Sequence, residues 1–163
     1  MPRGEWPGVT SRRRFFRTQL RSSRVGRRVR HHVLVEDSGR WHGVVIAEGL
    51  HDPAVINDLR VTKAFITGEG QPLDEAGMEG RWHLYWVFVS DDEIDRIQAG
   101  TRHAWYAHFW RADELVVVYD DARFGVHRHD QSTWKPAIDH GLEQGLRPEW
   151  LDFPTDDSVG TLG

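Results

Sequence analysis

The chain of 163 residues contains no cysteine. This absence excludes thiol nucleophiles, disulfide frameworks, cysteine-ligated zinc and iron–sulfur clusters. It also favours a reducing compartment, so we expect a cytoplasmic protein. A chain of this length buries enough apolar surface to fold as one domain without such crosslinks.

Long apolar runs and phosphate-binding motifs are missing as well. No segment approaches the roughly 18 apolar residues that a membrane-spanning helix needs, so we expect no membrane partner. The chain has two lysines, Lys63 and Lys135, and neither belongs to a Gly-Lys-Ser/Thr motif, which argues against a P-loop. Gly68 and Gly70 follow a predicted strand, but the third glycine of a dinucleotide-binding turn is absent.

Charge is distributed very unevenly along the chain. Residues 1–30 contain ten arginines and one acidic residue, a balance of +9. Residues 31–163 contain eleven basic and 24 acidic residues, a balance of −13. An acidic domain repels phosphate, so we expect no nucleic-acid binding by the folded part. Residues 1–30 are interpreted as a basic, disordered arm or an upstream extension. Binding of nucleic acid or an acidic partner would fall to the arginines of this arm: Arg12, Arg13, Arg14 and Arg17.

The hydrophobic pattern predicts a single α+β domain over residues 31–154, followed by a frayed tail at 155–163. Strands are expected at 43–47, 60–67 and 82–89, and a C-terminal antiparallel meander at 104–110, 115–119 and 123–128. The middle strand of the meander is apolar throughout and is predicted to be the central strand. Helices are expected after Asp52, after the capping box that begins at Ser90, and after Thr133. We expect these two or three helices to pack mainly on one face of the sheet.

Histidines are the main candidates for chemistry. His127 and His129 share a face if they lie in one strand, because side chains alternate with a period of two. His108 on the neighbouring part of the sheet could complete a divalent-metal site, which would make the protein a small His-based metal-dependent enzyme. If the strand register places His108 on the opposite face, the pair is instead a solvated surface feature. No other cofactor is predicted.

The eight tryptophans permit two interpretations. Most simply, they form the core between the sheet and the helices. Alternatively, some of them line a pocket for a planar or apolar small molecule. The residues assigned to such a pocket are His83, Tyr85, Trp105, Tyr106, His108, Trp110 and Arg111.

Four segments resemble a group of short uncharacterised bacterial proteins. They are Arg81 to Val87 (RWHLYWV), Trp105 to Trp110 (WYAHFW), Thr133 to Lys135 (TWK) and Leu151 to Phe153 (LDF). The resemblance covers about residues 43–154 and implies no particular activity, cofactor or partner.

No complete catalytic constellation is visible, so the sequence favours a non-catalytic binding or interaction module with an aromatic-lined pocket or face. The partner is an unidentified small molecule or a protein, and a homo-oligomer stays open. The metal-dependent enzyme and the nucleic-acid or acidic-partner binder remain as alternatives.

Deleting residues 1–30 should leave the melting temperature nearly unchanged, because the arm offers few apolar side chains to offset the entropy of ordering it. Thermal unfolding of the full chain and of the truncated chain, followed by circular dichroism, measures this. A large drop in melting temperature would show that the arm belongs to the fold.

Overall fold

The structure is a computed structural model that describes residues 39–74 and 76–155. The predicted basic arm, with Arg12, Arg13, Arg14 and Arg17, lies outside the described residues, as does the predicted tail beyond Thr155.

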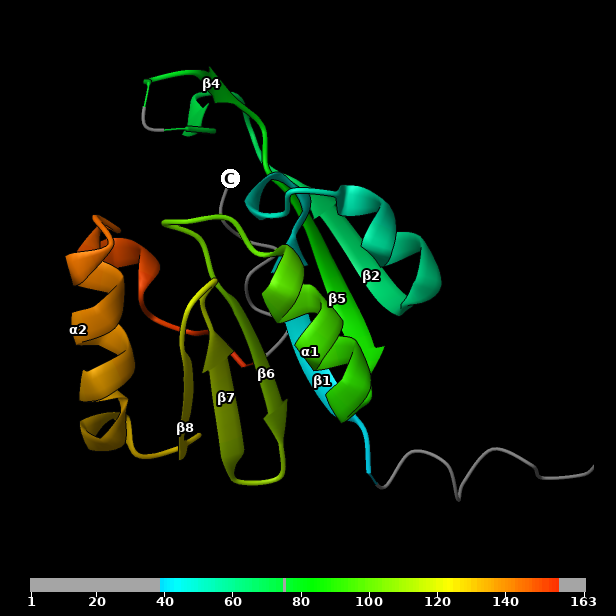
Figure 1. The fold of residues 1–163 in the computed structure, drawn as a ribbon, viewed down its shortest axis with the longest axis vertical. Coiled ribbons are helices and arrows are strands. Elements are labelled where there is room, and N and C mark those ends of the chain that lie inside the picture. Colours follow the sequence, from blue (N-terminus) through cyan, green and yellow to red (C-terminus); the bar gives the residue numbers. More distant parts are fainter. Residues whose placement is uncertain (1–38, 75, 156–163) are drawn as a thin grey trace, which may run out of the picture. The chain divides into compact units, whose positions relative to one another are not determined.

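Six strands form one antiparallel sheet, and two very short strands form a separate hairpin (Figure 1). The sheet has the order β2-β5-β1-β6-β7-β8. Its strands are β1 (Trp41–Ile46), β2 (Arg60–Ile66), β5 (His83–Val89), β6 (Ala107–Arg111), β7 (Glu114–Val118) and β8 (Arg123–His127). The hairpin consists of β3 (Gln71–Pro72) and β4 (Glu79–Gly80). The predicted α+β class and the predicted meander are therefore confirmed.

The sheet consists of two three-stranded halves that meet at β1 and β6. The register at this junction pairs His42 with Trp110, Gly43 with Phe109 and Val44 with His108. Within the meander β7 is the middle strand, but in the whole sheet it lies next to the edge strand β8 rather than at the centre.

Helix α1 (Asp91–Gly100) covers one face of the sheet, which we call the α1 face. The predicted capping box is present: the Ser90 hydroxyl accepts from the backbone N–H of Glu93, whose carboxylate accepts from the backbone N–H of Ser90. Ile94 and Ile97 of the helix are buried against the core residues of this face, Val45, Val87 and Phe109 among them. Among the described residues no helix is both long and apolar enough to cross a bilayer.

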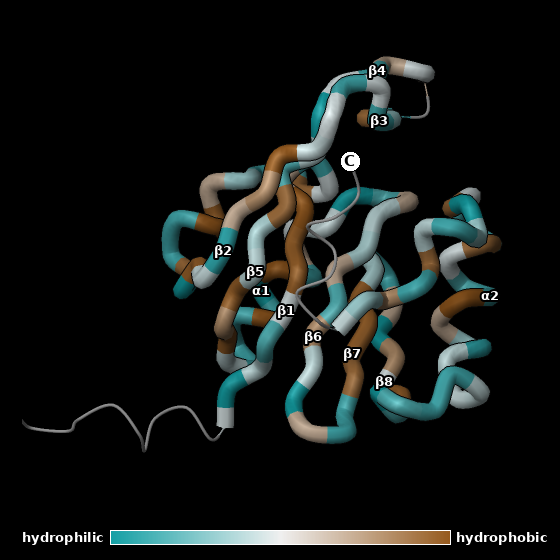
Figure 2. The backbone as a smooth tube through the Cα atoms, turned by 180° about the vertical axis from the view of Figure 1, so that it is seen from behind, coloured by the Kyte–Doolittle hydropathy of each residue, from teal (hydrophilic) through white to brown (hydrophobic). Residues whose placement is uncertain are grey.

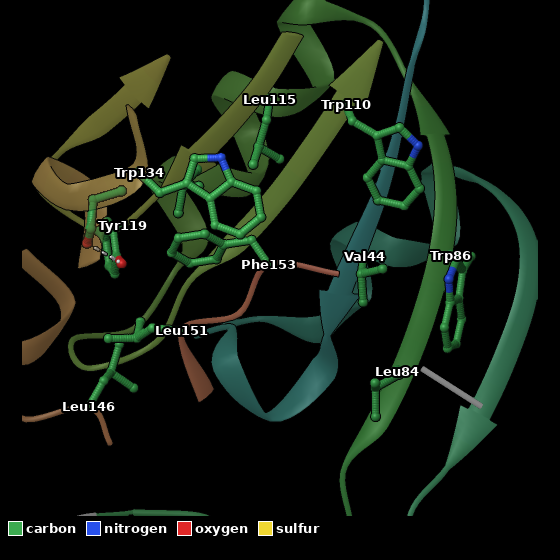
Figure 3. Close-up of a cluster of buried hydrophobic side chains, with 12 residues drawn as sticks. Val44, Leu84, Trp86, Trp110, Leu115, Tyr119, Trp134, Leu146, Leu151 and Phe153 are labelled. Atoms are coloured by element: carbon green, nitrogen blue, oxygen red, sulfur yellow. Dashed lines mark hydrogen bonds between the residues drawn. The ribbon is translucent and has the colours of Figure 1, made fainter. Parts of the chain in front are cut away.

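Helix α2 (Lys135–Glu143) covers the opposite face, which we call the α2 face. It follows the 3-10 helix η3 (Gln131–Trp134), which Asp130 caps, so that α2 itself begins after Trp134 rather than after the predicted Thr133. The Tyr119 hydroxyl donates to the carbonyl of Ala137 at 2.8 Å and ties the helix to the sheet (Figure 3). The expectation that the helices pack mainly on one face therefore differs from the structure. The reason is that both alternating sets of side chains are apolar in strands such as β7, so both faces need a cover.

Short 3-10 helices and an extended C-terminal segment complete the fold. The helix predicted after Asp52 is η2 (Pro53–Asp58), and the Asp52 carboxylate accepts from the N–H of Ala54 as expected of an N-cap. The others are η1 (Ala47–Gly49) and η4 (Pro148–Trp150). After η4 the chain returns to the α2 face, where Leu151 and Phe153 are buried (Figure 3).

Close packing at the junction of the two halves requires glycine at position 43, where the ring of Phe109 leaves no room for a side chain. Figure 2 shows hydrophobic stretches along β1 and β7. On the α1 face the ring of Phe109 lies directly over Gly43, so that a Cβ at Gly43 would stand 2.2 Å from Phe109 Cδ1. Both backbones are strand ladders and cannot retreat easily, so only glycine fits.

Replacing Gly43 by alanine should lower the free energy of unfolding by about 2 kcal/mol, because the new methyl group overpacks a closed core. Urea unfolding measures the effect. Gly125→Ala in β8 is the matched control, since a Cβ there meets nothing within 4 Å. Equal stabilities of the two variants would contradict the close approach of Phe109.

Candidate functional site

A cleft of 990 Å³ opens on the α2 face, beside the half of the sheet formed by β2, β5 and β1. It is bordered by the β3–β4 hairpin, by the loop that precedes β6 and by the segment around η4. We call it the tryptophan cleft, after Trp82, Trp105 and Trp150 in its walls. Its volume lies at the upper end of the range of about 300–1,000 Å³ typical of small-molecule pockets.

The three tryptophans contact one another and come from three distant parts of the chain. The Trp82 ring lies 5.7 Å from that of Trp105 and 5.7 Å from that of Trp150, with interplanar angles of 68° and 74°. All three side chains are half-buried. Edge-to-face packing of this kind stabilises the cluster and leaves part of each ring face free.

Neighbouring residues hold the tryptophans in place. The indole N–H of Trp82 donates to the carbonyl of Pro72 at 2.8 Å, which attaches the β3–β4 hairpin to the cleft wall. Trp105 lies on Gly49, where a Cβ would stand 2.8 Å from its ring. In the described part of the chain, the indole nitrogens of Trp105 and Trp150 have no hydrogen-bond partner.

The floor of the cleft is apolar. Val44 and Leu84 are buried core residues of β1 and β5, and Ile46 and Phe65 pack beside them, partly buried. The first two appear on their strands in Figure 3. Alternation along the strands directs these side chains to the α2 face, and this half of that face lies away from α2.

Tyr106 connects the cleft wall to the C-terminal segment. Its hydroxyl donates to the carbonyl of Trp150. Burial raises the pKa of Tyr106 far above its ordinary value, and the nearby carboxylate of Asp152 raises it further. The phenol therefore stays protonated at all physiological pH values and acts as a hydrogen-bond donor.

His108 lies at the inner end of the cleft and is 3% exposed. Its Nε2 donates to the carbonyl of Pro154 at 2.6 Å. The ring lies between Tyr106, with centroids 6.0 Å apart, and Trp110, with centroids 5.7 Å apart. Burial lowers the pKa of His108 to about 4, although the bond to Pro154 opposes this change. The imidazole is neutral near pH 7.

Charged groups of both signs stand at the rim. Arg102 donates to the carbonyl of Glu48 at 3.0 Å, and the guanidinium of Arg147 lies 4.9 Å from the Trp150 ring centre. Asp152 also borders the cleft, and partial burial raises the pKa of its carboxyl group. The rim therefore has no single dominant charge.

The structure brings together three of the seven residues that the sequence assigned to a pocket: Trp105, Tyr106 and His108. Trp110 shares their face but is buried beneath His108. The remaining three face away. His83 pairs with Glu48 at 2.6 Å on the α1 side, Tyr85 packs among the residues of the α1 face, and Arg111 lies over Trp41.

The structure does not bring His108, His127 and His129 together. His108 pairs with Val117, and Val117 pairs with Phe124. His127 lies three residues beyond Phe124, so its side chain projects from the opposite face. His129 follows the end of β8, with its ring 6.4 Å from that of His127. Within residues 39–74 and 76–155, no three His, Asp or Glu side chains are arranged to hold a metal ion.

Sequence reasoning missed Trp82 and Trp150 as cleft residues. The alternation of the strand at 82–89 places Trp82 on the same face as Leu84, and a large apolar ring such as that of Trp150 favours packing against the rest of the domain. The sequence therefore indicates the face of Trp82, but not that Trp150 lies beside it. The sequence pattern does not show that residues 67–82 and residues 146–154 come together in the folded domain.

Comparisons with known proteins add no assignment. No protein-family model matches the chain, and neither the curated proteins nor the solved structures contain a match.

The buried His108 should make the protein less stable in acid. The unfolded chain binds a proton at His108 below about pH 6.5, whereas the native state resists protonation down to about pH 4. Stability is therefore full above the first value and falls by about 3 kcal/mol in total as the pH drops through the second. Urea unfolding across this range measures the loss.

His108→Gln is the control, because glutamine does not titrate. Its stability should fall less steeply than that of the wild-type protein over the same pH range. The same pH dependence in both proteins would show that other groups cause the loss.

Proposed function

We propose that the protein binds a planar, mainly apolar small molecule in the tryptophan cleft. The observation that carries this proposal is the cluster of Trp82, Trp105 and Trp150, half-buried around a space of 990 Å³. Large rings that stay in contact with water do not gain the favourable free energy of burial. A cluster of partly exposed tryptophans above an apolar floor is therefore typical of a surface that a ligand covers. A planar ligand would cover these ring faces by stacking.

The polar groups of the cleft support binding rather than proton transfer. The donor groups of Tyr106 and His108 are both engaged by backbone carbonyls, those of Trp150 and Pro154. The pKa of Tyr106 is raised and that of His108 is lowered, so neither changes its protonation state near pH 7. Groups used in this way hold the walls in position and set the orientation of a ligand.

Fluorene, a planar hydrocarbon of three fused rings, is a suitable probe. Titration into protein with isotope-labelled indole nitrogens should shift the NMR signals of Trp82, Trp105 and Trp150. The signals of Trp41 and Trp134, which are buried outside the cleft, serve as internal controls. Shifts spread equally over all tryptophans, or no shift at all, would refute the proposal.

A pair of variants tests the same proposal by affinity. Trp105→Ala should weaken fluorene binding by about tenfold or more, because it removes one stacking wall. Tyr85→Ala is the matched control, since it removes a half-buried aromatic ring from the α1 face. Isothermal titration calorimetry gives both dissociation constants, and equal effects of the two substitutions would place the ligand elsewhere.

A further inference from the structure

The inner end of the cleft contains one polar side chain whose hydrogen-bonding capacity is only half used. His108 pairs in register with Val44, at the junction of the two halves of the sheet, and is 3% exposed. Its ring is held between the rings of Tyr106 and Trp110. Its orientation is therefore fixed by packing before any ligand arrives.

The hydrogen bond to Pro154 determines the tautomer of this imidazole. A carbonyl oxygen only accepts, so the proton of the neutral ring must be on Nε2, which lies 2.6 Å from the Pro154 oxygen. The other nitrogen, Nδ1, then carries a lone pair and is an acceptor. Burial favours the neutral ring, which preserves this acceptor near pH 7.

Nδ1 of His108 has no hydrogen-bond partner among the described residues. The hydroxyl of Tyr106, whose ring centre lies 6.0 Å from that of His108, donates to the carbonyl of Trp150 instead. His108 lines the cleft, and its Nδ1 is not one of the fully buried polar atoms that lack a partner, so this acceptor is accessible from the cleft. A donor group of a molecule bound in the cleft is positioned to satisfy it.

We propose that the ligand of the tryptophan cleft is an aromatic molecule with an N–H or O–H group at its edge, and that this group donates a hydrogen bond to Nδ1 of His108. This inference rests on the proposed function and narrows its ligand class. The tryptophans select a planar ring system by stacking, and His108 selects a donor over an acceptor or a hydrocarbon edge. A ligand that presents an acceptor there faces the lone pair of Nδ1 and is rejected.

Carbazole and fluorene test this selection directly. The two molecules have nearly the same shape, but carbazole has an N–H where fluorene has a CH₂ group. Carbazole should bind about tenfold more tightly, because one good hydrogen bond to an acceptor in the cleft wall changes the dissociation constant by about that factor. Isothermal titration calorimetry measures both affinities under the same conditions.

Two substitutions at His108 separate the roles of its ring nitrogens. The carboxamide of His108→Asn comes near the position of Nδ1 and keeps an acceptor there. That of His108→Gln comes near the position of Nε2 and keeps the donor to Pro154. The preference for carbazole should fall to near equality in the glutamine variant and persist in the asparagine variant. Its persistence in the glutamine variant would overturn the assignment to Nδ1.

The wild-type protein alone gives a second readout in case either variant fails to fold. With nitrogen-labelled histidine, carbazole should move the Nδ1 resonance of His108 in the direction of a hydrogen-bonded acceptor, and fluorene should leave it unchanged. Equal affinities for the two probes, with no movement of Nδ1, would overturn this inference and leave the proposed function standing. Failure of both probes to bind would overturn both.

Discussion

The C-terminal segment after η4 is the constraint on which the rest of the structure depends. It has no regular secondary structure, yet Leu151 and Phe153 are core residues, so its backbone carbonyls need donors from elsewhere. Side chains of the meander region supply them. Tyr106 donates to Trp150, His108 to Pro154, and Arg128 to Thr155 at 2.8 Å. Loss of these bonds would expose the core of the α2 face and remove one wall of the cleft together.

The same side chains therefore support the fold and form the wall of the cleft. Trp134 of η3 and Ala137 of α2 close the part of this face over β7 and β8, where they belong to the same buried cluster as Tyr119. Helix α2 does not extend over β1 and β5, and there the large rings of Trp82 and Trp105 border a cleft instead of a closed core. On the α1 face of the same strands the core is closed, with Val45, Val87 and Val89 at most 1% exposed.

Local patterns in the sequence predicted the elements well, but not their relative positions. The capping box at Ser90 and the strand expected at 82–89 depend on neighbouring residues, and both are confirmed. The face from which His127 projects depends on the strand register, which the turns between β6 and β7 and between β7 and β8 set. The first of these turns contains Ala112 in a left-handed conformation, with a φ of 49°, which the sequence pattern does not indicate. The cleft depends on the contact between Trp82 and Trp150, which no periodicity within either segment encodes. Packing between distant segments, rather than local propensity, determines which aromatic residues line the cleft.

The short ladder between β1 and β6 has a consequence for the internal motions of the domain. Three register pairs join the two halves of the sheet, whereas β1 and β5 share six. Within the six-stranded sheet, separation of the halves along this seam therefore breaks the fewest interstrand pairs. The amide hydrogens that bond across the β1–β6 ladder should exchange with solvent through this opening. The cleft straddles the seam, with Val44 and Leu84 from one half and Tyr106 and His108 from the other. A molecule bound in the cleft would contact both halves of the sheet. Its binding would therefore also slow the opening of the seam between β1 and β6.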